Sequence, residues 1–177
     1  MHRTLALLSS LAAIVGATGC SSSSSPSAAP PDCPPADVSF ANDVMPVFQA
    51  NCTTTSSCHG QMQDATAENL YLGESTGKTD PSAVYGGIFN VKAVENPSMN
   101  LITPGSTANS FLWHKLQSLA DLQALTSECA KSTATCTDCA GSPCGGVMPY
   151  LADAFSITNP DATCTIQNWI ANGAKNN

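Results

Sequence analysis

The order of apolar and polar residues after position 38 predicts a chain of short helices. Phe40, Val44 and Phe48 repeat every four residues, which is the spacing of one helix face. Asn42 is the expected N-terminal cap of this helix. Pro46 is close enough to the first turn to be tolerated. The helix leads directly into a cysteine motif.

Three further segments carry helical signals. Residues 81–90 form a short apolar stretch that a pair of glycines weakens. Residues 108–122 keep a spacing of three to four between apolar positions and follow a Pro-Gly turn. The last helix is expected to run from its cap, Asn159, to its stop, Gly173. Its apolar face comprises Ile166, Trp169 and Ile170.

The rest of the domain predicts loops. Residues 64–79 are irregular apart from Leu70 and Leu72, which we expect to point inward. No run of alternating residues is long enough to predict a sheet. Residues 38–177 have an ordinary length for one domain with one core. The expected fold class is therefore mostly α, a small helical domain with long loops.

The segment before this domain predicts export. Residues 1–19 have the layout of a secretory signal peptide, with Arg3 before an apolar run that is too short to span a membrane. Small residues lead into Cys20, as in a bacterial lipobox, so acylation of Cys20 would anchor the chain to a bilayer. An ordinary cleaved signal that releases the protein is the alternative. Residues 20–37, rich in Ser and Pro, are expected to form an extended linker.

The charge balance and the histidines limit the function. The chain has 6 Lys and Arg against 13 Asp and Glu and no basic cluster, which argues against nucleic acid as a partner. Only two of the 3 histidines follow the signal peptide, and neither lies beside a Gly-x-Ser-x-Gly motif. We therefore expect a carrier or binding protein rather than an enzyme. Its predicted location is the periplasm or the cell surface.

Eight of the 9 cysteines follow Cys20: Cys33, Cys52, Cys58, Cys129, Cys136, Cys139, Cys144 and Cys164. Disulfides are the usual state of cysteines in an exported protein. Four disulfides would use all eight, and three disulfides would leave two for a cofactor. The group from 129 to 144 is expected to hold a long loop by disulfides, with a zinc site of four cysteines as a second interpretation.

Cys52 and the sequence Cys58-His59-Gly60 form the most informative motif. A c-type haem is held by two cysteine thioethers, and the histidine after the second cysteine binds the iron. The usual spacing is Cys-x-x-Cys-His, whereas five residues separate the cysteines here. Helix residues six apart lie about 240° round the axis, so the insert has to loop out before both sulfurs can reach one haem. A Cys52–Cys58 disulfide, with His59 at the surface, is the alternative.

The order of signals across the domain resembles a class I cytochrome c domain of the kind found in exported bacterial lipoproteins. The matching segments are 38–48, 58–60, 104–116, 144–149 and 166–174.

The resemblance implies a membrane-anchored electron-transfer protein with one c-type haem and a redox partner protein. Cys52 and Cys58 would form the thioethers, His59 would be the proximal ligand and Met148 the distal ligand. His114 would be a second choice if Met148 does not serve. The resemblance also implies that Trp169 packs against the first helix. The alternative is a haem-free, disulfide-rich lipoprotein that acts as a binding or structural module, with Met148 as a core residue.

Overall fold

The computed structural model describes residues 32–55, 58–62, 68–76, 78–129, 144–149 and 153–177. The predicted signal peptide, Cys20, most of the linker and two cysteines, Cys136 and Cys139, lie outside these residues. The described elements are all helical: η1 (Phe40–Val44), α1 (Met45–Asn51), α2 (Pro81–Ile88), η3 (Thr107–Asn109), α3 (Phe111–Leu116), α4 (Leu119–Ala124), α5 (Thr126–Cys129), α6 (Phe155–Thr158) and α7 (Pro160–Ala171).

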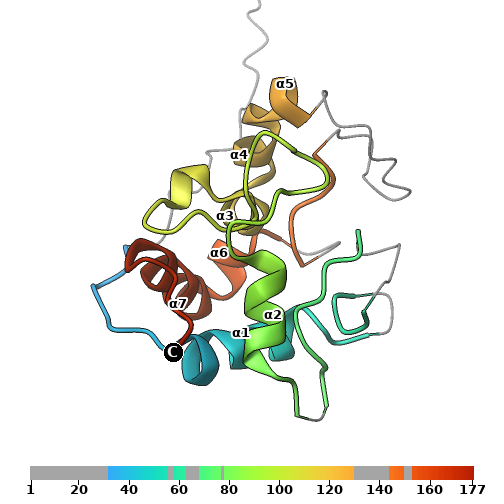
Figure 1. Ribbon diagram of the computed structural model, residues 1–177. Coiled ribbons are helices and arrows are strands. Elements are labelled where there is room, and N and C mark those ends of the chain that lie inside the picture. Colours follow the sequence, from blue (N-terminus) through green and yellow to red (C-terminus); the bar gives the residue numbers. More distant parts are fainter. Residues whose placement is uncertain (1–31, 56–57, 63–67, 77, 130–143, 150–152) are drawn as a thin grey trace, which may run out of the picture.

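The mostly α class is therefore confirmed for the described part of the chain. Over those same residues, pairing between extended segments is limited to isolated bridges such as Phe89 with Ile102. In Figure 1, α3, α4 and α5 are stacked at the top of the molecule, and α7 crosses near η1 and α1 at its base.

The first predicted helix forms in two parts, with η1 as a π-helical turn that continues into α1. Its cap is Ser39 rather than the predicted Asn42, because the Ser39 hydroxyl accepts a hydrogen bond from the Asn42 backbone N–H at 3.2 Å. This supplies an acceptor for one of the N–H groups that a helix start leaves open. The predicted apolar face is confirmed, since Phe40, Val44 and Phe48 are all buried.

Helix α7 packs against this first helix, as predicted. The rings of Trp169 and Phe40 stack with their centroids 5.0 Å apart. Asn159 stands at the predicted cap position of α7, but its side chain makes no capping bond. Its amide group donates instead to the Thr158 hydroxyl at 3.4 Å. Gly173 follows the helix with a positive φ of 94°, a conformation that glycine adopts without strain.

The predicted helix over residues 108–122 is interrupted. It forms as η3, α3 and α4, with a break at Gln117 and Ser118. The hydroxyl of Ser118 accepts from the backbone N–H of Asp121, and the Asp121 carboxylate accepts from the backbone N–H of Ser118. This capping box starts a new helix, so local hydrogen bonding overrides a continuous apolar spacing.

Two disulfides join described residues. Cys129–Cys144 closes a loop of 15 residues, and Cys33–Cys164 joins the start of the described chain to α7 across 131 residues. The expectation of disulfides in this protein is confirmed for these four cysteines. Cys129 and Cys144 are joined to each other in this structure, which favours the disulfide interpretation of this group over a zinc site of four cysteines.

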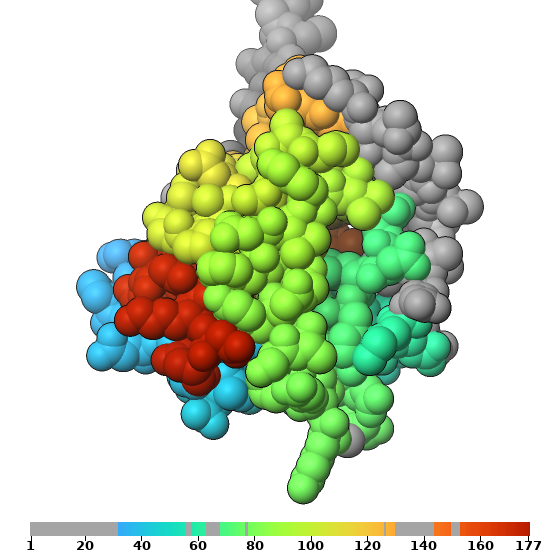
Figure 2. Space-filling view, viewed as in Figure 1, coloured from blue at the N-terminus to red at the C-terminus, as the bar shows by residue number. Residues whose placement is uncertain are grey.

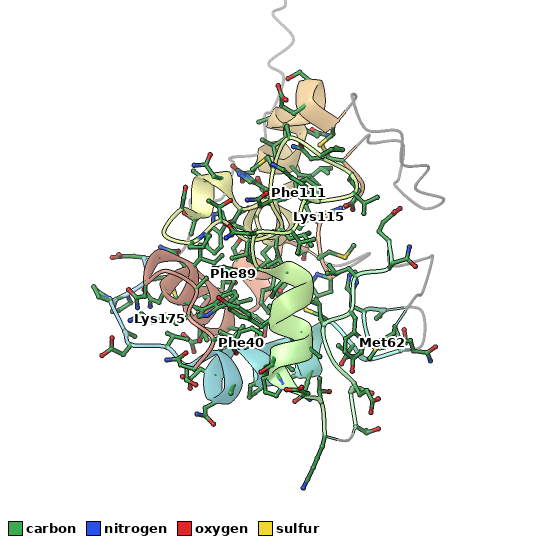
Figure 3. The ribbon with its side chains drawn as sticks, in the orientation of Figure 1. Phe40, Met62, Phe89, Phe111, Lys115 and Lys175 are labelled. Atoms are coloured by element: carbon green, nitrogen blue, oxygen red, sulfur yellow. A yellow bond between two sulfur atoms is a disulfide. The ribbon has the colours of Figure 1, made fainter. Side chains whose placement is uncertain are left out.

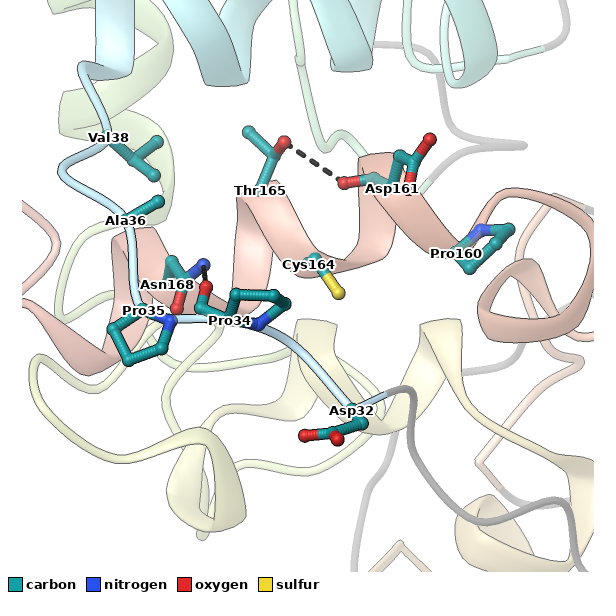
Figure 4. A pocket seen from close by; sticks show the side chains of 10 residues that line it. All are labelled: Asp32, Pro34, Pro35, Ala36, Val38, Pro160, Asp161, Cys164, Thr165 and Asn168. Carbon is teal, nitrogen blue, oxygen red and sulfur yellow. Dashed lines mark hydrogen bonds between the residues drawn. The ribbon is translucent and has the colours of Figure 1, made fainter.

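The described end of the predicted linker lies along α7. The side-chain amide of Asn168 donates to the Pro34 carbonyl at 2.9 Å, and that of Asn172 donates to the Ala36 carbonyl at 2.8 Å. Figure 4 shows Pro34 and Pro35 beside the helix, with Cys164 and Asn168 facing them. The disulfide and these two bonds attach residues 33–36 to the last helix.

Among the described residues, no helix is both long and apolar enough to cross a membrane.

Candidate functional site

Cys52 terminates α1 at the start of the cysteine motif. Its backbone N–H donates to the Phe48 carbonyl at 2.7 Å, which closes the last turn of the helix. The side chain is half-buried and carries a thiol. Burial, and to a lesser degree the proximity of Cys58, raises the pKa of this thiol to about 12. Cys52 therefore stays protonated at neutral pH, because desolvation disfavours the thiolate.

Helix α1 ends at Asn51, and the described residues on either side of the insert bring the chain back to Cys52. The Thr53 hydroxyl donates to the Gln49 carbonyl at 2.9 Å, which satisfies one of the carbonyls that the end of α1 leaves open. After the loop, the His59 backbone N–H donates to the Cys52 carbonyl at 3.0 Å. The histidine is thus held beside the first cysteine although six residues lie between them.

Gly60 allows this return because the chain passes close to Thr53. A Cβ atom at Gly60 would lie 3.1 Å from the Thr53 carbonyl oxygen and 3.3 Å from its Cβ. Cys58, two residues earlier, carries a thiol whose sulfur is 3.1 Å from the Thr55 hydroxyl. Both sulfurs of the motif are therefore present as thiols, in contrast to the disulfide that would close the same loop.

His59 is oriented by the backbone of the following extended segment. Its ring Nδ1 lies 3.0 Å from the Leu70 carbonyl oxygen, and its own carbonyl accepts from the Leu72 N–H at 2.9 Å. A carbonyl oxygen can only accept, so Nδ1 donates in this contact, and in a neutral imidazole Nε2 would be the nitrogen with the electron pair that binds a metal. Leu72 is buried in the core, so this segment gives the imidazole a firm support.

Met148 lies on residues 144–149, a segment without regular secondary structure that turns at Gly145 (φ of 71°) and packs against α3. Its backbone N–H donates to the Lys115 carbonyl at 2.7 Å, and its half-buried side chain packs against the hydrophobic core. The Lys115 ammonium group donates to the Cys144 carbonyl at 2.7 Å and to the Gly146 carbonyl at 3.1 Å. A single lysine thus contacts this segment at three alternate residues.

Lys115 is itself buried and ion-paired. Its Nζ atom lies 3.1 Å from Glu95 Oε1, and both side chains are largely shielded from water. Neither Lys115 nor Glu95 has a role predicted from the sequence. The available signal was the position of Lys115 within the apolar spacing of residues 108–122, because a lysine on a buried helix face needs a partner.

The Glu68 carboxyl group interacts electrostatically with the Lys115–Glu95 ion pair. Burial raises the pKa of the Glu68 carboxyl group, Glu95 raises it further, and Lys115 partly opposes this. Glu68 is two residues before Leu70, whose carbonyl orients the His59 ring. The segment that supports His59 therefore passes within electrostatic range of the ion pair that holds the Met148 segment.

The surface of the molecule is hollowed beside the segment that follows the cysteine motif (Figure 2). Figure 2 shows a hollow on this face between the turquoise to green segment after the cysteine motif and the light-green chain before residue 100.

The remaining candidate ligands are engaged elsewhere or exposed. His114 Nε2 lies 3.0 Å from the Ala108 carbonyl oxygen, so this ring nitrogen of the second-choice ligand is engaged with the backbone. Met62 is 69% exposed and lies at the edge of the molecule in Figure 3. Within the described residues, no group of three or more His, Cys, Asp or Glu side chains is arranged to hold a metal ion.

No protein-family model, curated protein or solved structure matches this chain. The arguments for a function therefore come from the residues and their geometry.

Proposed function

We propose that this protein is a membrane-anchored electron carrier with one c-type haem. Cys52 and Cys58 would hold the haem through thioethers, with His59 as the proximal and Met148 as the distal ligand. A haem bound in this way supplies an iron that alternates between two oxidation states. The observation that carries the proposal is the 3.0 Å contact between His59 Nδ1 and the Leu70 carbonyl.

Metal-bound histidines usually make a contact of this kind, with the ring nitrogen that does not bind the metal donating to a carbonyl or carboxylate oxygen. A hydrogen bond from one ring nitrogen to a backbone carbonyl selects the tautomer, fixes the ring plane and increases the basicity of the other nitrogen. A histidine that served only as a surface residue would have no need of this support. His59 is instead held through its backbone N–H, its carbonyl and its ring.

The two thiols fit the attachment chemistry. Thioether formation adds a cysteine S–H across a vinyl group, so it requires thiols at both positions. Cys52 and Cys58 both carry thiols, whereas Cys33, Cys129, Cys144 and Cys164 form disulfides. The hydrogen bond from His59 to the Cys52 carbonyl compensates for the long spacing, because it keeps the first cysteine next to the ligand histidine.

The remaining features support an electron carrier over an enzyme. A thioether ligand such as Met148 stabilises reduced iron and raises the reduction potential. Electron transfer at a haem edge requires no substrate pocket. The disulfides favour an oxidising compartment, which agrees with export and with an anchor at Cys20. A redox partner protein would receive or supply the electron.

The test is a pyridine haemochrome spectrum of the denatured protein after coexpression with cytochrome c maturation genes. We expect a c-type band that survives extraction with acidified acetone. Cys52→Ala and Cys58→Ala should each shift the band toward that of a haem with one unreacted vinyl group. Met62→Leu, which changes an exposed methionine, serves as the control for Met148→Leu and should leave the spectrum of the folded protein unchanged.

A shortened variant separates a defect in attachment from an unsuitable scaffold. Deletion of residues 54–56 leaves Cys52-Thr53-Ser57-Cys58-His59, the usual spacing. Haem in this variant but not in the natural chain would show that the scaffold accepts haem and that the natural protein does not carry it. Absence of haem from both would contradict the proposal and favour the haem-free binding or structural module.

A further inference from the structure

We propose that Lys115 is a positioning residue for Met148. The inference rests on the proposed function, in which Met148 is the distal ligand, but the contacts that carry it belong to the protein alone. Lys115 lies in α3, and Met148 follows 33 residues later on the far side of the Cys129–Cys144 disulfide. The two are brought together only by the folded structure.

Every hydrogen-bonding group of the Lys115 ammonium has a partner. Nζ carries three protons, and three acceptors surround it: Glu95 Oε1 at 3.1 Å, the Cys144 carbonyl at 2.7 Å and the Gly146 carbonyl at 3.1 Å. The ammonium also lies 5.4 Å from the centroid of the Phe111 ring, which Figure 3 labels beside it. A lysine used as a nucleophile or proton carrier would keep a position open. Because all three protons are engaged, the arrangement indicates that Lys115 has a structural role.

The hydrogen bonds of Lys115 reach every second residue of one short segment. The side chain of Lys115 binds the carbonyls of residues 144 and 146, and its own carbonyl accepts the N–H of residue 148. The three hydrogen bonds to one lysine therefore fix the path of residues 144–148, and the position of Met148 follows from that path.

Glu95 is the counter-ion of Lys115 and aims its ammonium group inward. A buried ammonium without a counter-ion would be costly, and the carboxylate offsets that cost. Charge-assisted hydrogen bonds to the two carbonyls are stronger than neutral ones, so the segment is held more firmly than by backbone pairing alone. The pair thus acts on Met148 through the backbone of residues 144–148.

The experiment uses the haem-free protein first and measures oxidation of each methionine by dilute peroxide, followed by peptide mass spectrometry. Lys115→Met alone would leave Glu95 buried and unpaired, which could unfold the protein. The key variant is therefore Lys115→Met with Glu95→Gln, which removes both charges and keeps the volumes. We expect Met148 to be oxidised about tenfold faster or more, because two charge-assisted hydrogen bonds to its segment are lost.

Two other methionines act as internal references. Met62 is exposed and should oxidise at the same rate in all variants, and Met45 is buried in the core and reports global unfolding. Lys92→Met is the matched control, because the exposed Lys92 makes one hydrogen bond, to the Ser98 carbonyl. An unchanged rate at Met148, or an equal rise at Met45, would overturn the positioning role.

The second readout uses the haem-loaded protein. We expect the double variant to retain covalent haem but to lose the sulfur-to-iron charge-transfer band of the oxidised form and to show a lower reduction potential. A potential and a band equal to those of the natural protein would contradict the role of Lys115. If the natural protein binds no haem, the proposed function fails, while the peroxide measurement still decides whether Lys115 positions Met148.

Discussion

The two disulfides should differ in their contribution to stability because they close loops of very different length. Cys33–Cys164 links residues 131 apart, and Cys129–Cys144 links residues 15 apart. In the chain-entropy account, a cross-link stabilises the fold by restricting the unfolded chain, and the effect grows with the logarithm of loop length. This gives about 5 kcal/mol for the long loop and about 3 kcal/mol for the short one.

The perturbation is removal of each pair in turn, as Cys33→Ala/Cys164→Ala and as Cys129→Ala/Cys144→Ala. The difference between the two variants, about 2 kcal/mol, is more secure than either absolute value because common errors cancel. The long loop also carries a local contribution, since its disulfide attaches the segment at Pro34 and Ala36 to α7. Both effects make its removal the more damaging change.

The assay is equilibrium unfolding in guanidinium chloride, followed by the fluorescence of Trp169 and Trp113. Both tryptophans are buried, so their emission reports exposure of the core. The measurement is made at mildly acidic pH, where few thiolates are present and disulfide exchange is slow. The denaturant slope should rise in each variant, because an unfolded chain with one fewer cross-link exposes more surface.

An equal loss of stability in both variants, or a greater loss on removal of Cys129–Cys144, would refute this reasoning. It would mean that the short disulfide acts mainly through the folded state, by holding the start of the Met148 segment. Urea unfolding of a Cys33→Ala/Cys164→Ala variant that also carries Asn168→Ala would then measure how much of the remaining stability comes from the hydrogen bond to Pro34.

Three further predictions follow from single residues. In the haem-free protein, the rate of Cys52 alkylation should rise about tenfold per pH unit up to pH 11, because its thiol has a pKa of about 12 and only the thiolate reacts. A rate that reaches a plateau near pH 9, measured by peptide mass spectrometry, would contradict this. Gly73→Ala should destabilise the protein by about 1–2 kcal/mol, because Gly73 has a φ of 106° and a Cβ there would lie 3.1 Å from the Met45 side chain. The control Gly86→Ala, in open space within α2, should stabilise it by about 0.5–1 kcal/mol, and thermal unfolding that ranks the two variants the other way would refute the argument. Burial raises the folded-state pKa of Glu68 above its unfolded value, so its stabilising contribution is present below the unfolded pKa and is lost as the pH rises through the folded pKa. The Glu68→Gln variant should therefore lose less stability than the natural protein between pH 4 and pH 7. Parallel curves of unfolding free energy against pH would contradict this.

Local signals predicted much of the helical framework. The spacing of Phe40, Val44 and Phe48 identified a buried face because four residues make about one helical turn. The last helix and its contact with the first were predicted in the same way, and the Trp169–Phe40 stack confirms the contact. The apolar spacing did not predict the break at Ser118, because a capping box can interrupt a helix while the spacing continues.

The sequence by itself determined the residue types of the candidate site: two cysteines, an adjacent histidine and a late methionine. It also required the insert after Cys52 to loop out, because helix geometry separates residues six apart. Tertiary structure alone decided what supports them. The Leu70 carbonyl that orients His59 and the Lys115 ammonium that holds the Met148 segment are 11 and 33 positions away along the chain. Such contacts depend on how separate segments pack, which no local period or spacing encodes.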